Sequence, residues 1–583
     1  MSSWRQREQA QQFLELERGE CSRTVGDRLR VALCFPNSYY VGMSNLGLQT
    51  VHHLFNAEPG VSCERVFLPP KQEVRALMAA RSPLLTLETQ TPVSDFDVLA
   101  FTVSFEWDYV NILTIMRLAG IPVYASERTS RHPLIVLGGA VTFLNPEPLA
   151  PFVDLVTAGE GEALVPALVA AAGSADRKAV LRTLATMPGF YVPSLYAVRY
   201  ADDGTVEPHE PIDPALPPFV TKASVPSVRD LDPPCTRIFT PQTEFGSRFL
   251  IEVVRGCANL CRFCWAGYNY LPVRAFSTSR ILACAERAKI HANKVGLVSI
   301  ALCDHPDIEE ILARLLNLGY TVSPASLRLD DLTPRIIELL YQSGQRTLTI
   351  APETGSDRLR RVINKTVTNA QIVDRADAIL SSGIENLKLY FMIGLPTETD
   401  DDLTAIHDLV RRIRDRMLVH ARRRGRPGRL VASVNPLVPK PGTTYQWLSM
   451  TPLAVVASRT KRLRSLMAGL DHVYLSIKSE RHSYYQALLS LGDRRIAPVI
   501  DAAAQNGGDW RRAVETADID SDFWVFRDRS RDRALPWDII GGGAKAGFFR
   551  SEFDKGLREE WTLSQRRTGV AGAGAAVGDL VSG

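Results

Sequence analysis

Apolar runs of strand length alternate with amphipathic stretches through most of this chain, and this alternation restricts its fold more than any other feature. Residues 30–36, 97–105, 133–138 and 153–158 are such runs, and the stretch 109–119 between them has helical periodicity. Buried strands separated by helices are typical of a parallel sheet covered by helices. The first part of the chain is therefore predicted to be an α/β domain.

The second half of the chain continues this alternation in a longer series. Helical patterns at 333–342 and 369–381 separate further runs of strand length. Six βα-type units in sequence predict a barrel or partial barrel, with the chemistry at the carboxyl ends of its strands. The runs of this series are 248–254, 295–301, 323–328, 346–351, 386–393 and 430–435.

Changes in composition indicate where these units begin and end. We expect the N-terminal α/β domain, with an extension at its start, over 1–220, and a Pro- and Asp-rich linker over 221–245. The barrel core is expected over 246–452 and a mostly helical region over 453–567. The Gly/Ala-rich tail 568–583 is predicted to be disordered.

The 583-residue chain has an ordinary globular composition, with 45% hydrophobic and 23% charged residues. Its net charge of +4 is too small to indicate a nucleic-acid or membrane partner by itself. It has no apolar run of signal-peptide or membrane-span type, so we expect no membrane partner. Nine cysteines are too few for a disulfide scaffold of this size, which predicts a reducing, cytoplasmic location.

Three of the nine cysteines, Cys257, Cys261 and Cys264, fall within eight residues directly after a predicted strand. Thiolates so close together repel one another, and a positive centre stabilises them. A structural zinc site usually takes four ligands in paired units, whereas Cys235 and Cys284 are distant and unpaired. The triplet therefore predicts a [4Fe-4S] cluster with one open iron, with zinc or unrelated thiols as the alternatives.

This CxxxCxxC spacing after the first barrel strand resembles the signature of radical S-adenosylmethionine (radical SAM) enzymes. Phe263 matches the aromatic position that the family places near the adenine, and the stretches 326–365 and 388–402 resemble its third to fifth strands. The resemblance implies a partial (β/α)6 TIM-type barrel. It also implies one-electron cleavage of S-adenosylmethionine (SAM) to a 5′-deoxyadenosyl radical, for hydrogen abstraction or methyl transfer, with a donor such as flavodoxin or ferredoxin.

The same resemblance suggests roles for polar residues at the strand ends. Asp304 stands where the family binds the methionine amine of SAM, and Glu353 is a second candidate for the amine or the ribose. Ser326 and Arg328 end the third strand, where polar groups meet the ribose or the methionine carboxylate, and an arginine can pair a carboxylate through two hydrogen bonds. A helix cap or a turn contact is the alternative role for each of these four residues.

Two further features at the ends of the barrel strands have predicted roles. The backbone of Ile393 and Gly394, after the fifth strand, is expected to pack on the adenine. Cys303, at the mouth of the second strand, is either a hydrogen donor or covalent handle in catalysis, or a small buried side chain without a chemical role.

The first 200 residues resemble the cobalamin-binding-like Rossmann domain that precedes many radical SAM barrels. The matching segments are 35–47, 100–109, 136–147 and 156–168, whose glycines allow the backbone to approach a flat ligand. The family ligates cobalt through the histidine of a DxHxxG motif, and this chain has Gly42, Ser44 and Gly47 in that register. Either cobalamin binds without a histidine ligand, or the domain is a scaffold that shapes the substrate pocket.

The substrate is not legible from the sequence. The segment 410–429 carries nine arginines and one aspartate, which suits either an RNA contact beside the barrel mouth or a solvated helix end. The segment 434–447 also resembles methylthiotransferases and related RNA-modifying enzymes, but the chain lacks their auxiliary three-cysteine cluster. The leading hypothesis is a radical SAM enzyme. The alternative is a non-catalytic iron–sulfur protein that binds RNA or acts as a redox protein.

Overall fold

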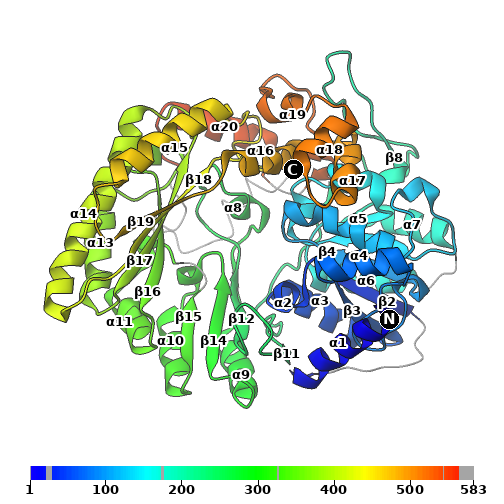
Figure 1. Cartoon of the computed structure of the whole chain (residues 1–583), viewed down its shortest axis with the longest axis horizontal. Helices are drawn as coiled ribbons and strands as arrows, with labels where there is room; N and C mark the ends of the chain where they lie inside the picture. The colour runs from blue at the N-terminus through cyan, green and yellow to red at the C-terminus, as the bar shows by residue number, and fades with distance from the viewer. Residues whose placement is uncertain (1, 21–28, 173–175, 325–326, 542–543, 563–583) are drawn as a thin grey trace.

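The computed structural model describes residues 2–20, 29–172, 176–324, 327–541 and 544–562. The predicted tail 568–583 and the candidate residue Ser326 lie outside the described residues. Figure 1 shows two α/β domains side by side, the N-terminal one in blue to cyan and the barrel in green to yellow. Helices of the C-terminal part, in orange, lie over the N-terminal domain.

A six-stranded sheet forms the N-terminal domain, and its strands are parallel except for the edge strand β7. The four predicted strands are present, and α5 (Tyr109–Leu118) occupies the predicted helix. Helices α3 (Leu46–Ala57) and α6 (Gly161–Ala172) share one apolar core with the sheet, and α5 belongs to the other core, so the sheet is covered on both faces. The strand order, β3 (Val61–Phe67), β2 (Leu29–Phe35), β4 (Val98–Thr102), β5 (Leu134–Gly138), β6 (Leu155–Thr157), β7 (Phe190–Tyr191), is a doubly wound order whose switch point lies between β2 and β4.

Strand β3 is absent from the sequence prediction because charged residues interrupt its apolar run. The structure nevertheless buries both Glu64 and Arg65. The Thr86 hydroxyl donates to Glu64 at 2.6 Å, and Arg65 forms ion pairs with Glu17 at 2.7 Å and Glu88 at 2.6 Å. These partners compensate the loss of hydration that otherwise excludes charges from a sheet interior.

The barrel consists of two four-stranded sheets that contain all six predicted strands. Within the described residues β15 and β16 do not pair, so the barrel is partial. The first sheet has the order β13 (Arg274–Ala275), β12 (Phe249–Arg255), β14 (Lys294–Ser299), β15 (Thr321–Pro324). The second has the order β16 (Thr347–Glu353), β17 (Asn386–Ile393), β18 (Leu430–Pro436), β19 (Val473–Ile477).

Helices follow the barrel strands as the periodicity predicts. Two of them, α11 (Pro334–Gln342) and α13 (Asn369–Ser381), lie within a residue of the predicted bounds. Both begin at a threonine whose hydroxyl accepts a backbone N–H of the first turn, which is a start signal legible in the sequence. The other helices beside the barrel are α9 (Thr278–Ala288), α10 (Ile308–Asn317), α14 (Asp400–Arg424) and α15 (Leu453–Met467).

Strand β19 lies inside the region that we expected to be mostly helical. It pairs in parallel with β18, from Leu430 opposite Val473 to Val434 opposite Ile477. Its residues alternate between half-buried and exposed, as on an edge strand with one covered face. The rest of the region is helical, with α16 (Glu480–Leu491), α17 (Ala497–Gln505), α18 (Trp510–Ala517), α19 (Asp522–Phe526) and α20 (Ala546–Leu557).

The segment between the domains is fixed at both of its ends. Strand β10 (Val220–Thr221) pairs in parallel with β20 (Ile540–Gly541), and β11 (Ile238–Phe239) pairs antiparallel with β1 (Arg18–Gly19). Gly159 of the N-terminal domain also forms a bridge with Ala223. The linker therefore connects the two domains through backbone hydrogen bonds as well as through the chain.

The C-terminal helices complete the core of the N-terminal domain. One apolar cluster joins Phe101 of β4 and Ile112 of α5 to Leu488, Ile500 and Trp510 of the C-terminal helices. A second large cluster fills the barrel, between its strands and its outer helices. None of the helices in the described ranges has the length and apolarity needed to cross a membrane.

Candidate active site

The three clustered cysteines lie in the loop that leaves the carboxyl end of β12 and enters α8 (Ala266–Asn269). Gly256 begins this loop with a φ of +95°, and a Cβ there would lie 2.3 Å from the backbone oxygen of Tyr270. Only glycine tolerates both the left-handed backbone and the close approach. The glycine therefore sets the turn that brings the cysteines to the barrel mouth.

The thiols of Cys257, Cys261 and Cys264 are near enough to influence one another electrostatically. Burial raises the pKa of Cys261 to about 12 and raises the pKa of Cys257 and Cys264 as well. Backbone N–H groups of Ala266 and Gly267 donate to Cys264. Such amide donors stabilise the thiolate form that a metal centre requires.

The number and the chemical kind of these ligands, three cysteine thiols, fit an iron–sulfur cluster. Within the described ranges, no three His, Cys, Asp or Glu side chains converge closely enough to hold one metal ion. A four-iron cluster is larger than one ion, so its thiolate ligands stand farther apart than the ligands of a single ion. Cys257 and Cys261, which are buried, and Cys264, which is partly buried, are the residues that would hold such a cluster.

The loop is held from outside by side chains that the sequence analysis did not identify. Arg262, between two of the cysteines, is fully buried. Its guanidinium donates to the backbone oxygen of Arg361 at 2.7 Å and pairs with Glu552 of α20 at 3.2 Å. Asn364 donates to the backbone oxygen of Leu260 at 3.0 Å. The geometry of the cysteine loop therefore depends on α20, near the end of the described chain.

Asp304 and Arg328 form an ion pair beside the first cysteine. The Arg328 guanidinium lies 2.9 Å from a carboxylate oxygen of the buried Asp304, and its Nη1 lies 4.0 Å from the Cys257 sulfur. The other carboxylate oxygen of Asp304 accepts the N–H of Ala258 at 3.3 Å. The structure brings these two predicted residues to the cysteine loop from the turns that follow β14 and β15. The prediction that Arg328 ends the third strand is wrong, because β15 ends at Pro324.

A second ion pair lies on the other side of the loop. Glu353 ends β16 with a φ of +66°, and its carboxylate lies 3.6 Å from the ammonium of Lys365. Burial opposes the charge on Lys365, but Glu353 and the thiols of Cys261 and Cys264 raise its pKa above the ordinary value. Lys365 carries no signal in the sequence, because it lies on a connection between helices and not at a strand end.

The predicted adenine-side residues also lie together. Phe263 packs against the apolar cluster that contains Leu395, directly after β17. Ile393 is fully buried, and Gly394 has a φ of +82°. The Gly394 N–H donates to Glu398 at 2.8 Å, so the glutamate of the GLPTET stretch fixes the turn.

Cys303 lies in the short turn after β14, which also holds Asp304. Its side chain is partly buried and packs against the barrel core. This placement is at the mouth of the second strand, where the sequence analysis expected it.

Two adjoining cavities, of about 310 and 460 Å³, lie between the N-terminal sheet and the barrel mouth. The smaller one enters the sheet at its carboxyl edge, beside Ala100 of β4, where doubly wound folds bind ligands. The larger one reaches Gly256 and Trp265 at either end of the cysteine loop. The residues shared by both linings are Gly47, Val51, Gly159, Gly161 and Tyr270.

Aromatic rings form one wall of these cavities. The ring centroid of Tyr270 lies 5.6 Å from that of Trp265 and 5.5 Å from that of Phe143. The ammonium of Lys222 lies 5.9 Å from the Phe143 centroid, and burial lowers the pKa of Lys222 to about 8. Trp265 and Tyr270 therefore give the cavity next to the cysteine loop its aromatic faces, and Phe143 lines the smaller cavity.

The N-terminal cavity fits cobalamin only in part. Its place at the switch point suits a flat cofactor, but its described lining includes no histidine that could ligate cobalt. A Cβ on Gly139 would lie 2.3 Å from the backbone oxygen of Val103, and one on Gly159 would lie 2.1 Å from that of Ala223. These two glycines are required by the protein's own backbone, so they do not indicate a bound ligand.

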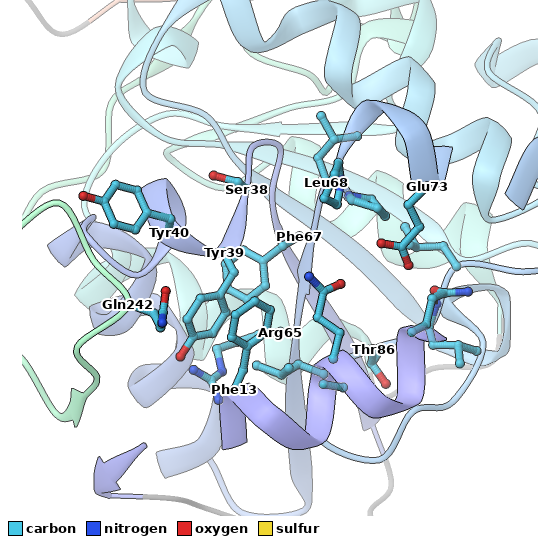
Figure 2. Close-up of a pocket in the computed structure, with 18 residues that line it drawn as sticks. Phe13, Ser38, Tyr39, Tyr40, Arg65, Phe67, Leu68, Glu73, Thr86 and Gln242 are labelled. Carbon is cyan, nitrogen blue, oxygen red and sulfur yellow. The ribbon is translucent and has the colours of Figure 1, made fainter. Parts of the chain in front are cut away.

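A third cavity, of about 180 Å³, lies under α1 (Ser2–Leu16), away from the cysteine loop. Figure 2 shows Arg65, Tyr39 and Phe13 along it. Arg65 is paired with Glu17 and Glu88, and Tyr39 donates to Glu17 at 2.7 Å. Arg65 is thus neutralised by its partners, whereas Glu73 lines the same cavity with an Oε1 that has no hydrogen-bond partner among the described residues, and burial raises its pKa.

The arginine-rich segment 410–429 lies at the end of the barrel opposite to the cysteine loop. Helix α14 returns from the carboxyl end of β17 to the start of β18. Arg426 pairs at 2.6 Å with Glu385, directly before β17, and Arg424 donates to the backbone oxygen of Leu380. These contacts place the end of the segment at the start of β18, away from the cysteine loop, and the RNA contact stays a prediction.

The fold and the cysteine loop define a class of protein. Residues 47–193 match the family of radical SAM proteins, N-terminal region, and residues 251–410 match the radical SAM superfamily. Together the two matches span just over half of the chain. The chain belongs to the radical SAM superfamily, and its first domain matches the N-terminal region of radical SAM proteins.

Among its relatives, an uncharacterized protein of Methanocaldococcus jannaschii is 26% identical over 478 residues, which are 81% of this chain and 90% of that protein. A tRNA-2-methylthio-N(6)-dimethylallyladenosine synthase of Acidithiobacillus ferrooxidans is 30% identical over 196 residues, 29% of this chain and 41% of the synthase. The radical SAM methyltransferase TsrM of Kitasatospora setae has a similar fold, with a TM-score of 0.50 and 14% identity over 84% of this chain and 100% of that one. The predicted fold class, a Rossmann-like domain with a partial barrel, is confirmed.

Proposed function

We propose that Cys257, Cys261 and Cys264 ligate a [4Fe-4S] cluster and that the enzyme reductively cleaves SAM for hydrogen abstraction or methyl transfer. The observation that carries this proposal is the buried cysteine loop at the carboxyl end of β12 with an ion pair on each side. When bound, the cluster supplies the electron that converts SAM to methionine and a 5′-deoxyadenosyl radical. A flavodoxin or ferredoxin is the proposed electron donor.

The Asp304–Arg328 pair is complementary to the methionine end of SAM. An α-amino carboxylate carries one positive and one negative group, and the pair presents one group of each sign 2.9 Å apart. Arg328 can hold the carboxylate through two hydrogen bonds, and Asp304 can accept from the amine. Arg328 also pairs with Asp331, so the SAM carboxylate would join a guanidinium that already has two carboxylate partners. The opposite charges of Asp304 and Arg328 beside Cys257 support them as the SAM-binding residues.

The remaining assignments follow the same arrangement. Glu353 is proposed to accept from the ribose hydroxyls or the amine, with Lys365 keeping its charge in place. Phe263, Ile393 and Gly394 are proposed to pack on the adenine, because the turn after β17 is apolar and fixed by Glu398. Ser326, although outside the described residues, stays a candidate on its sequence position alone.

The reaction test uses the anaerobically reconstituted full chain with dithionite and SAM. We expect release of 5′-deoxyadenosine, and we expect Cys261→Ala to lose both the cluster absorbance and the release. Cys63→Ala is the matched control, because Cys63 is buried in the N-terminal sheet and should leave both unchanged. No release from wild-type protein with a full cluster would favour the alternative, a non-catalytic iron–sulfur protein.

Hydrogen abstraction and methyl transfer are separated by a titration with hydroxocobalamin followed in the ultraviolet and visible range. A saturable spectral change supports methyl transfer through the N-terminal cavity, and no change supports the scaffold role. Cys303 is proposed as a hydrogen donor or covalent handle. Full substrate turnover by Cys303→Ala with an intact cluster would contradict that role.

A further inference from the structure

Two cysteines outside the cysteine loop meet on the outer side of the barrel. Cys235 lies in the linker and forms a bridge with Ile251 of β12, and Cys284 lies on α9, which packs against the same strand. The side chains of Cys235 and Cys284 hydrogen-bond to each other. The fold therefore brings together two thiols that are far apart in the sequence.

Both thiols line a cavity of about 280 Å³ that is separate from the cavities beside the cysteine loop. Phe239 and Phe249 form its apolar side, and His291 stacks on Phe239 at a centroid distance of 4.9 Å. Both cysteines are buried, and the cavity that they line contains none of the proposed cluster ligands.

The two thiols differ in their surroundings. The Arg287 guanidinium lies 3.1 Å from the Cys284 sulfur. The hydrogen bond from Cys235 and the charge of Arg287 lower the pKa of Cys284, whereas the same hydrogen bond and burial raise the pKa of Cys235. The other charged or titratable groups around the pair are Glu20, Asp232, Arg237 and His291.

We propose that Cys235 and Cys284 form a thiol–disulfide exchange site for small disulfides, with Cys284 as the attacking thiol and Cys235 as the resolving one. A paired nucleophile and resolving thiol beside a cation is the arrangement that thiol exchange requires. The site is independent of the radical chemistry, because neither thiol is a proposed cluster ligand.

The exchange proceeds in two balanced steps. The Cys284 thiolate attacks one sulfur of the disulfide R–S–S–R, the S–S bond breaks, and the departing thiolate takes up the proton that Cys284 lost. Cys235 then attacks the Cys284 sulfur, releases the second R–S group and passes its proton to it. The small disulfide is reduced by two electrons to two thiols, and the protein gains a disulfide between the linker and α9.

The test uses the reconstituted full chain under anaerobic conditions with bis(2-hydroxyethyl) disulfide, followed by alkylation of free thiols and peptide mass spectrometry. Wild-type protein should yield a Cys235–Cys284 cross-linked peptide. Cys235→Ser should accumulate the mixed disulfide on Cys284, and Cys284→Ser should leave Cys235 alkylated. Cys34 and Cys63, whose pKa burial raises, serve as internal controls and should remain unmodified by the disulfide.

Arg287→Gln tests how the charge of Arg287 affects the reactivity of Cys284, without removing a thiol. It should slow modification of Cys284 at pH 7 by about tenfold, since losing the cation raises the thiol pKa. Melting temperatures of all variants establish that they fold. Unmodified Cys284 in folded Cys235→Ser protein, or faster adduct formation on Cys235 than on Cys284, would overturn the proposal.

Discussion

At the scale of single residues, the charge of Lys365 counteracts the burial that raises the pKa of two of the proposed cluster ligands, Cys261 and Cys264. Lys365→Met keeps the length of the side chain and leaves Glu353 without its ion-pair partner. We expect reconstituted Lys365→Met to retain several-fold less iron per chain after gel filtration, because an unpaired carboxylate then faces thiolates. The control is Lys294→Met, at the exposed start of β14. Equal iron retention by the two variants would contradict this role.

Asp108 gives a pH-dependent prediction outside the site. Burial raises its pKa to about 6, although Asn37 and Asn111 donate to it. A carboxyl whose folded pKa is raised contributes stability below its unfolded pKa near 4, and this contribution is lost as the pH rises through about 6. Asp108→Asn should therefore be more stable than wild type at pH 7.5, by roughly 1–3 kcal/mol, and equal to it at pH 4.

Thermal melting of both proteins between pH 4 and 8 measures this difference. Asp202→Asn, in an exposed turn, should follow the wild-type curve throughout. A constant offset between Asp108→Asn and wild type across the whole range would show that the pKa of Asp108 is not raised by folding.

At the scale of elements, α20 supports the cysteine loop through one buried ion pair. Glu552 and Arg262 are both fully buried, so Glu552→Gln leaves the guanidinium charge uncompensated. We expect a loss of about 3–5 kcal/mol of local stability and a lower iron content in the reconstituted protein. Glu560→Gln is the control, because its side chain is exposed and pairs only with Arg558 among the described residues. Iron loss in both variants alike would contradict the anchoring role.

The sequence predicted elements well where a single periodicity or a cap signals them. The runs at 386–393 and 369–381 correspond to β17 and α13 to the residue. Strand β3 was missed because the buried charge of Arg65 depends on partners distant in the sequence. Lys365 and Arg262 were missed for the same reason, since their roles arise only when helices after β16 and α20 fold against the loop.

At the scale of the whole molecule, one buried ion pair joins three parts of the chain. Lys440, after β18, pairs with Glu106 of the N-terminal domain, and Ser490 of α16 donates to Glu106 at 2.7 Å. Lys440→Met should destabilise the protein by about 3–5 kcal/mol, because the buried carboxylate of Glu106 then loses its ion-pair partner. Adding Glu106→Gln should restore part of that loss, and a double-mutant cycle from denaturant unfolding measures the coupling.

The exposed pair Arg511–Glu515 provides the comparison for this cycle. Surface pairs on a helix contribute about 0.3–0.5 kcal/mol. A coupling energy for Lys440 and Glu106 no larger than that of the surface pair would mean that the contact does not hold the three parts together.

The apolar cluster shared by the N-terminal domain and the C-terminal helices has a consequence for synthesis. Phe101 and Ile112 leave the ribosome hundreds of residues before Leu488 and Trp510, their partners in that cluster. One face of the N-terminal sheet therefore stays uncovered while the barrel is being translated. A nascent chain of this protein exposes this apolar face for most of its translation. We expect chaperones to release the chain only after the last helices emerge.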